Sequence, residues 1–426
     1  MALDKEKYQA YISILKEELV PALGCTEPIA IAYAAARARE VLGSFPDKVI
    51  VRCSGNIIKN AKSVIVPNTG NLKGIIASAL AGILVGDSTK EMSLLEELTE
   101  SDIAKIKELM QTDICRVEML KSDANLHIVI QVMYADNEAS VEIKHTHTNI
   151  TRIEKDGKLI FQKKCKGENL NGFSTDRSTL NVRDIFDFAN TVKLEDIVDL
   201  LKGQIEYNLS IAREGINGNY GCGVGKMLIE CYGDNTFTKI RAYAAAGSDA
   251  RMNGCNLPVV TNSGSGNQGM TTSLPVIIYA QEKKIDQEKM YRGLVLSNLI
   301  TIHLRSAMGR LSAYCGAVCA ACGSGAGITY LAGGTLKQIE RTITNTLGNV
   351  SGIVCDGAKS SCAAKIASGL DAAIMAHFLA MRGTAFETNS GIIKETVEDT
   401  IAAVGRLGHD GMKATDVEVL KIMLGQ

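Results

Sequence analysis

Residues 125–155, NLHIVIQVMYADNEASVEIKHTHTNITRIEK, decide the fold class. Apolar and polar residues alternate through this stretch and β-branched residues are frequent, a pattern typical of strands with one buried face. Two similar runs flank it, KVIVRCSG at 48–55 and KLIFQKK at 158–164. Because Gly, Asn and Asp turns separate the runs, we expect an antiparallel sheet with one covered face.

The rest of the chain favours helices. Helical stretches are expected at 72–85 and 100–110, between the strands, and long Ala-, Gly- and Ser-rich helical stretches follow from about 180 to the end. The sequence therefore predicts an α+β protein with two domains. We expect residues 1–45 and 166–426 to form a helical domain and residues 46–165 to form an inserted α+β domain.

The composition excludes several classes of protein. Of 426 residues, 46% are hydrophobic and 22% are charged, with a formal net charge of −1, so neither nucleic acid nor anionic membrane is an expected partner. The polar N-terminal stretch MALDKEKYQAYISILKEEL lacks the apolar core of a secretory signal. No run of about 18 apolar residues occurs. We therefore expect a cytoplasmic protein without a membrane span.

Twelve cysteines are unusual for such a chain, because disulfides are not expected in a reducing compartment. Isolated cysteines in strand-like or helix-like runs are expected to be small buried hydrophobes: Cys53, Cys115, Cys165 and Cys231. Five others gather within 315–362 and favour binding of a soft metal or a cluster. They are Cys315, Cys319, Cys322, Cys355 and Cys362.

The spacing of these five cysteines leaves the ligands open. Cys315, Cys319 and Cys322 share one helix face, so spacing cannot choose among them. A redox role for the CxxC pair has little support, because no thioredoxin-like βαβ pattern surrounds it. Cys355 and Cys362 bracket a short polar loop that opens an Ala-rich helix, where backbone amides suit an anionic cluster. Two incidental cysteines in a turn remain the alternative.

Cys25, in the motif LGCTEP, precedes a predicted helix start. The positive end of a helix dipole favours a thiolate, which could act as a nucleophile, a base or a ligand. An incidental cysteine before a capped helix is the alternative.

Three further motifs have polar or anion-binding character. The loops TNSGSGNQG at 261–269 and PNTGNLKG at 67–74 resemble anion cradles, although plain turns have the same composition. The string YGCGVGK at 220–226 resembles a phosphate-binding loop but lacks its first glycine and its Ser/Thr, so nucleotide binding is not expected. His145 and His147 would share one side of a strand, as a zinc site, as a contact to the substrate or to another site residue, or as a solvated face.

Taken together, six strings resemble the L-cysteine desulfidase family, which is related to the iron–sulfur L-serine dehydratases. The strings are PALGCTEPIAIAYAAA, SGNIIKN, VPNTGNLKG, TNSGSGNQG, SAYCGAVCAACGSGAG and VCDGAKSSC, and the similarity covers nearly the whole chain. The resemblance implies an oxygen-sensitive homodimer that converts L-cysteine into hydrogen sulfide, ammonia and pyruvate.

The same resemblance implies roles for individual residues. Cys315, Cys355 and Cys362 would hold a [4Fe–4S] cluster with one open iron, and Cys319 and Cys322 would be packing residues. Cys25 would be the catalytic base. The loops would hold the substrate carboxylate and ammonium through Ser263, Gly264, Asn267, Thr69 and Asn71.

Other functions stay open at this point. The loop between the last two ligand cysteines is shorter than in the serine dehydratases, which favours cysteine as substrate over serine. An open iron could bind a carboxylate and a thiolate and so make the α-proton more acidic. The alternatives are an iron–sulfur L-serine dehydratase, a non-catalytic iron–sulfur sensor or sulfur carrier, and a Cys-rich structural protein.

Overall fold

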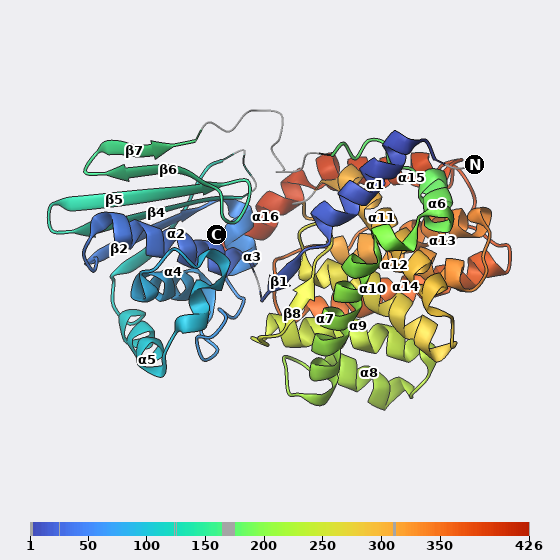
Figure 1. Ribbon diagram of the computed structural model, residues 1–426, viewed down its shortest axis with the longest axis horizontal. Coiled ribbons are helices and arrows are strands. Elements are labelled where there is room, and N and C mark those ends of the chain that lie inside the picture. The colour runs from blue at the N-terminus through green and yellow to red at the C-terminus, as the bar shows by residue number, and fades with distance from the viewer. Residues whose placement is uncertain are drawn as a thin grey trace.

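The computed structural model describes residues 3–24, 26–122, 124, 126–163, 175–309 and 312–425. The chain forms two lobes, one built around a sheet and a larger one built from helices (Figure 1). This arrangement confirms the predicted α+β class.

The larger sheet has six strands, in the order β3-β2-β4-β5-β6-β7. The strands are β2 Lys48–Cys53, β3 Cys115–Met119, β4 His127–Tyr134, β5 Asn137–Lys144, β6 Ile150–Lys155 and β7 Lys158–Gln162. Neighbours are antiparallel except β2 and β3, which run parallel. The prediction of a wholly antiparallel sheet therefore misses one pair. The connection from β2 to β3 contains helices, and a crossover of this length permits parallel pairing.

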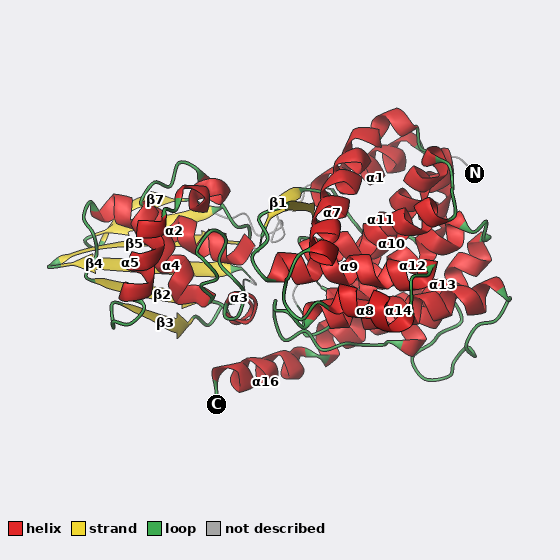
Figure 2. Cartoon of the chain, turned by 90° about the horizontal axis from the view of Figure 1, so that it is seen from below, coloured by secondary structure: helices red, strands yellow, loops and turns green. Residues whose placement is uncertain are grey.

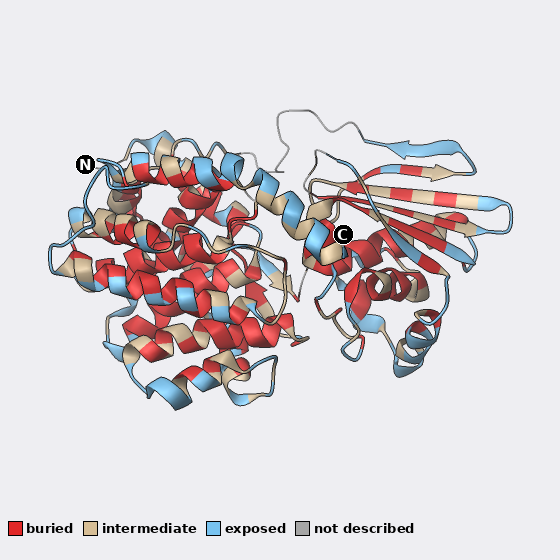
Figure 3. Cartoon of the chain, turned by 180° about the vertical axis from the view of Figure 1, so that it is seen from behind, coloured by how far each residue is buried: buried red, intermediate tan, exposed pale blue. Residues whose placement is uncertain are grey.

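One face of the sheet is covered, as predicted. Ile128, Ile130 and Val132 of β4 are fully buried, while the side chains between them are partly exposed. They pack with helices α2 (Thr26–Leu42) and α4 (Gly74–Val85) in a single hydrophobic cluster. At the sheet edge, β7 is exposed along its length (Figure 3).

Helix α2 lies with the sheet, whereas the predicted domain boundary placed residues 1–45 with the helices. Its Ala-rich surface lets α4 approach closely: a Cβ at Gly82 would come 2.0 Å from the carbonyl oxygen of Ala32. Before α2, strand β1 (Pro21–Leu23) pairs with β8 (Pro258–Val260) of the helical lobe. The chain therefore enters the sheet lobe earlier than expected. The second predicted boundary, at 165/166, lies outside the described residues.

The helical lobe surrounds α12 (Gly316–Leu331), whose residues from 317 to 331 are all buried. Helices α10, α11, α13 and α14 pack around it. Small side chains permit this close packing, and a Cβ at Gly323 would come 2.1 Å from the hydroxyl of Thr301. The helices of this lobe are α1 Lys5–Glu18, α6 Val182–Thr191, α7 Val198–Asn217, α8 Val224–Tyr232, α9 Thr236–Met252, α10 Gly266–Glu282, α11 Gln287–Met308, α13 Leu336–Asn349, α14 Cys362–Met381 and α15 Val397–Arg406.

Among the described residues, α14 is long and apolar enough to cross a membrane by length and composition. Its most apolar window is 56% buried, and the helix packs against α9, α12 and α13. These contacts are those of a core helix.

The last helix, α16 (Lys413–Leu424), runs from the helical lobe to the sheet lobe (Figure 2). There it lies against α3 (Gly55–Ala61). Asp416 pairs with the buried Lys59 at 2.5 Å, and Leu420 packs over Gly55. The described part of α16 has no fully buried residue, and it is attached to the sheet lobe through Leu420 and Leu424, which pack against the hydrophobic cluster of that lobe.

Candidate metal centre and substrate cavity

A cavity of about 400 Å³ lies between the lobes. The sheet lobe contributes side chains from α3 and from the loops before β4 and after β5. The helical lobe contributes the first turn of α10, the start of α12 and the loop before α14. Both lobes are therefore needed to form its walls.

Three cysteines line this cavity, and each comes from a different position in the fold. Cys315 is the N-cap of α12, Cys362 is the first residue of α14, and Cys355 lies in the loop between α13 and α14. The backbone brings Cys315 and Cys355 together, because the amide of Cys315 donates to Ile353 (2.8 Å) and the amide of Cys355 donates to Ala313 (2.7 Å).

The return of the chain to Cys362 depends on Gly357. This residue has a φ of +93°, and a Cβ there would come 2.0 Å from the carbonyl oxygen of Lys59 in α3. Only glycine fits this approach without displacing backbone. The Cys362 thiol then lies 3.7 Å from the Gly357 carbonyl oxygen. The cysteine loop is consequently pressed against the sheet lobe.

The three thiols differ in acidity. The Cys315 thiol donates a hydrogen bond to Cys355, which lowers the pKa of Cys355 and raises the pKa of Cys315. The charges of Lys59 and Arg305 lower the pKa of Cys355 further. Burial raises the pKa of Cys362. Cationic side chains beside the cavity thus favour a thiolate, the form of cysteine that binds metals.

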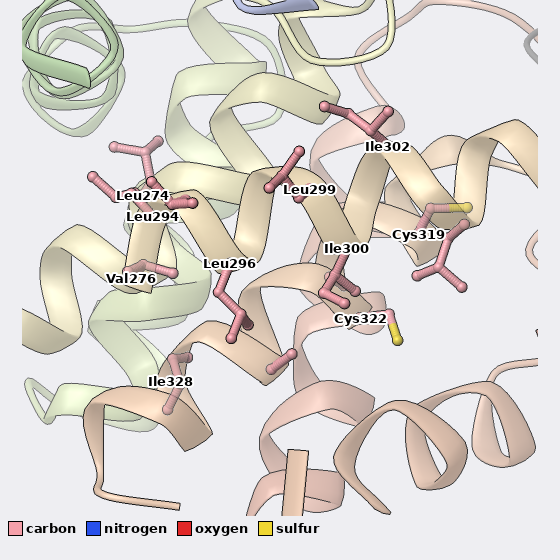
Figure 4. Packing of buried hydrophobic residues seen from close by; sticks show 14 of the residues in the cluster. Leu274, Val276, Leu294, Leu296, Leu299, Ile300, Ile302, Cys319, Cys322 and Ile328 are labelled. Atoms are coloured by element: carbon pink, nitrogen blue, oxygen red, sulfur yellow. The ribbon is translucent and has the colours of Figure 1, made fainter. Parts of the chain in front are cut away.

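Cys319 and Cys322 point away from this cavity. Both are fully buried in the helical core among apolar side chains (Figure 4). The Cys319 sulfur lies 3.1 Å from the sulfur of Met308, and Cys322 faces the carbonyl of Ile343 at 3.8 Å. Burial raises the pKa of Cys319 to about 11, which opposes thiolate formation. Helix spacing places Cys319 and Cys322 on the same face as Cys315, and only their burial in the core separates them from it.

The three cavity cysteines supply donors of the kind that hold an iron–sulfur cluster. Within the described ranges, no three His, Cys, Asp or Glu side chains surround one point as ligands of one metal ion would. A cluster takes its thiolates on different irons, so the sulfurs line a volume. Cys315, Cys355 and Cys362 offer soft donors around such a volume, with Lys59 and Arg305 as nearby positive charge.

The loop at 261–269 reaches the same cavity. Ser263, Gly264 and Asn267 line it, and Ser263 has a left-handed backbone with a φ of +52°. Its hydroxyl donates to Asn262 (2.8 Å), which is held by the buried Asn298 (3.0 Å). This buried amide network fixes the loop at the cavity wall.

Two predicted contacts do not reach this cavity. Thr69 is fully buried and its hydroxyl donates to the carbonyl of Val66 at 2.7 Å, so the turn itself occupies its hydrogen-bonding group. Asn71 adopts a left-handed φ of +72° in the same turn. The turn instead borders a separate cavity of about 240 Å³, lined by Pro67, Asn68 and residues of the helical lobe.

The predicted base, Cys25, lies outside the described residues. Its neighbours are placed at the cavity: Thr26 and Glu27 line it, and the carbonyl of Gly24 accepts a hydrogen bond from Arg251 at 2.8 Å.

The predicted strand placement of the two histidines is wrong, whereas their position at the cavity agrees with the alternative of a substrate contact. Strand β5 ends at Lys144, and His145 adopts a φ of +71°, so the pair belongs to a turn and not to a strand face. Both His145 and His147 line the cavity. Arg251 was missed because it lies in no quoted string. Gln268 and Lys59 lie within the strings TNSGSGNQG and SGNIIKN but were not singled out, because only the fold shows that their side chains line the cavity.

In the string that resembles a phosphate-binding loop, the backbone amides are bound by a side-chain carboxylate of the protein itself. The carboxylate of Asp249, which is fully buried, accepts a hydrogen bond from the backbone amide of Gly225 (3.3 Å) at the start of α8, and the backbone amides of Cys222 and Val224 also favour its charged form. Burial raises the pKa of this carboxyl to about 6. An internal carboxylate therefore takes the place that a phosphate would need.

The isolated cysteines that were predicted to be buried differ in their exposure. Cys53 and Cys115 are buried under the sheet, as predicted, whereas Cys231 is exposed at the end of α8. Cys165 lies outside the described residues.

Comparison with known proteins identifies the family. The model of the serine dehydratase alpha chain family matches residues 89–421. The chain belongs to this family. The serine dehydratase alpha chain family groups dehydratase-like lyases and is associated with iron–sulfur clusters, which agrees with the cysteine set.

Close relatives extend over the whole chain. A UPF0597 protein of Lachnoclostridium phytofermentans is 54% identical over 417 residues, covering 98% of this chain and 100% of that protein. One from Desulfitobacterium hafniense is 52% identical, covering 98% and 97%. One from Treponema denticola is 48% identical, covering 100% of both chains. The names of these three relatives specify no substrate.

Proposed function

We propose that the protein is an L-cysteine desulfidase that converts L-cysteine and water into hydrogen sulfide, ammonia and pyruvate by β-elimination. The observation that carries the proposal is the position of Cys315, Cys355 and Cys362 on one cavity wall, with Cys319 and Cys322 turned into the core. In the proposal, the first three cysteines hold a [4Fe–4S] cluster. A bound cluster with one iron free of protein ligands would supply a Lewis acid for the departing sulfur.

In the proposal, residues around the cavity remove the α-proton, bind the amino acid and balance the charge of the thiolates. Cys25 takes the α-proton onto its thiolate, the bond between the β-carbon and sulfur breaks, and hydrosulfide (HS⁻) leaves with the bonding electrons. Hydrosulfide then takes up a proton, which restores the Cys25 thiolate when the proton comes from its thiol. The resulting aminoacrylate reacts with water to give pyruvate and ammonia. Ser263, Gly264 and Asn267 lie on the wall where the amino acid would bind. Lys59 and Arg305 offset the negative charge of the thiolates.

Cysteine is favoured as substrate on chemical grounds. Its side-chain sulfur is a soft donor that suits an iron–sulfur centre. The loop from Cys355 to Cys362 lies against α3 at Gly357. In the proposal, the shortness of this loop, taken from the sequence resemblance, also favours cysteine over serine.

L-Serine dehydration at the same cavity is the second candidate, and the family match favours it. In that reaction the leaving group is hydroxide, and the base and the cavity wall would keep their roles.

The decisive experiment is an anaerobic comparison of the two amino acids with one preparation of known iron content. We expect pyruvate and sulfide from L-cysteine at a much higher kcat/KM than pyruvate from L-serine. Rapid turnover of serine with inert cysteine would establish the dehydratase instead. Iron binding without turnover of either amino acid would favour a sensor or sulfur carrier, and absence of iron would favour a structural protein.

The base is tested separately. Cys25→Ser should retain iron and lose turnover, because a serine hydroxyl is not ionised at neutral pH. Loss of iron in this variant would make Cys25 a ligand.

A further inference from the structure

Arg251 is a buried cation that faces the cavity. It lies near the end of α9, is 7% exposed and lines the cavity wall. Its guanidinium donates to the carbonyl of Gly24 at 2.8 Å and to the side-chain oxygen of Asn267 at 3.3 Å. Its Nε is buried without a hydrogen-bond partner among the described residues, and the two acceptors of its guanidinium, a backbone carbonyl and an amide oxygen, are both uncharged. Burial of an uncompensated charge is costly, so this site favours an anion from the cavity.

The backbone beside Arg251 points to the same kind of ligand. Helix α10 begins at Gly266, where a Cβ would come 2.5 Å from the Arg251 Nε, so the guanidinium lies directly against the first turn. The first turn of a 17-residue helix carries unpaired amides and a partial positive charge, both of which favour a carboxylate. The guanidinium and the helix terminus are two independent sources of anion affinity at one place.

Gln268 contributes a hydrogen-bond acceptor to the same cavity, in addition to the donors of Arg251. It is 8% exposed and lines the same cavity, and its side-chain oxygen is buried without a hydrogen-bond donor among the described residues. Its carboxamide lies against Gly316, where a Cβ would come within 2.4 Å. Gly316 follows Cys315, so this unpaired acceptor stands beside the cysteine wall. A buried acceptor without a donor favours a ligand that carries N–H groups.

We propose that Arg251 and Gln268 together recognise the zwitterionic head of an α-amino acid. The guanidinium and the first turn of α10 bind the carboxylate, and the Gln268 oxygen accepts a hydrogen bond from the ammonium. The substrate's α-carbon is thereby held next to the cysteine wall. This inference rests on the proposed function for the identity of the amino acid, and binding itself requires no turnover.

The test uses ligands that cannot react. L-Alanine carries the zwitterion but no leaving group, propionate lacks the ammonium, and ethylamine lacks the carboxylate. Binding of each is measured by anaerobic calorimetry on the iron-loaded protein. We expect L-alanine to bind more tightly than either fragment. Arg251→Gln should weaken L-alanine and propionate by about 10- to 100-fold and leave ethylamine unchanged.

A second variant gives the opposite pattern. Gln268→Leu should weaken L-alanine and ethylamine and leave propionate unchanged. Arg251→Lys, which keeps the charge, should recover part of the affinity. Arg241→Gln is the matched control, because Arg241 lies earlier on the same helix and pairs with Asp371 (2.7 Å). Thermal unfolding of each variant shows whether a loss of binding is a loss of fold.

Two outcomes would overturn the proposal. One is wild-type protein that binds ethylamine or propionate as tightly as L-alanine. The other is folded Arg251→Gln and Gln268→Leu proteins that bind all three ligands as the wild type does. Failure of the desulfidase proposal is a separate result. If serine and not cysteine were turned over, or neither, the L-alanine pattern would still decide the role of Arg251.

Discussion

The guanidinium of Arg251 donates to the carbonyl oxygen of Gly24 at 2.8 Å, across 227 residues of sequence. Gly24 has a φ of +52°, and a Cβ there would come 2.8 Å from the ring of Pro67. One hydrogen bond and one glycine conformation therefore fix the carbonyl that immediately precedes Cys25.

Gly24→Ala should lower turnover far more than it lowers iron content. The substitution strains a left-handed residue by about 1–2 kcal/mol and forces the backbone away from Pro67, so the carbonyl leaves Arg251. Gly43→Ala is the matched control, because Gly43 has a φ of +85° and a Cβ there would meet nothing within 4 Å. Equal activity of the two variants, measured per bound iron, would show that Gly24 does not position the site.

The five clustered cysteines should separate into two groups on substitution by alanine. Loss of Cys315, Cys355 or Cys362 should abolish iron uptake and the visible absorption of the reconstituted protein. Cys319→Ala and Cys322→Ala should keep both, because these side chains pack in the core, and should cost about 0.5–1.5 kcal/mol of stability. Iron loss in Cys319→Ala with retention in Cys315→Ala would exchange their roles.

Gly357→Ala should disrupt the cysteine loop. A Cβ at this position would come 2.0 Å from the Lys59 carbonyl oxygen, in addition to the strain of a φ of +93°. We expect a loss of about 2–5 kcal/mol together with poor iron uptake. Gly333→Ala shares the positive φ but meets no neighbour, and should cost only about 1–2 kcal/mol. Similar melting temperatures for the two variants would contradict the close approach.

Asp416→Asn should loosen α16. The Lys59 side chain is 3% exposed and Asp416 is 28% exposed, so removing the carboxylate leaves a buried cation unpaired, at about 1–3 kcal/mol. Amide hydrogen exchange should accelerate over 413–424. Glu418→Gln, on the same helix and paired with the exposed Lys421, is the control and should change exchange little. Unchanged exchange in Asp416→Asn would remove the ion pair as an anchor.

Asp249 should make the protein less stable as the pH rises, which is the opposite of the usual effect of an aspartate. Burial raises the pKa of its carboxyl to about 6, so between about pH 4 and 6 the folded state binds more protons than the unfolded state. Its contribution to stability therefore falls as the pH rises through this window. Asp249→Asn keeps an acceptor for the amides of α8 but does not titrate. Chemical denaturation across pH 4–7 should show a flatter profile and higher stability at pH 7 for the variant, whereas identical slopes would exclude this ionisation.

Local patterns predicted the elements and much of the candidate site. The alternation of apolar and polar residues at 127–144 predicts the strands β4 and β5. The cysteine-rich strings contain the three thiols that line the cavity. Periodicity could not assign α2 to a lobe, because an Ala-rich helix packs equally well on a sheet or on helices. Its partner was decided by the close approach at Gly82.

The missing parts of the site depend on long-range geometry. Arg251 stands in no quoted motif, and Gln268 lies in the 261–269 loop without having been singled out, because only a three-dimensional arrangement reveals the unpaired atoms of both residues. Conversely, the turn at Thr69 has the composition of a ligand-binding loop, yet its hydroxyl is used by Val66. Composition reports which atoms can bind, whereas folding decides which atoms remain available.

The crossing of α16 has a consequence for how relatives could diverge. Each lobe has its own hydrophobic cluster, so the separation of the two walls is governed by the few ties between them, including the ion pair of Lys59 with Asp416. Substitutions on this peripheral helix can widen or narrow the space for a side chain without altering any residue that meets the amino acid. We therefore expect that substitutions on this surface helix can change which substrate side chains fit the cavity in members of this family.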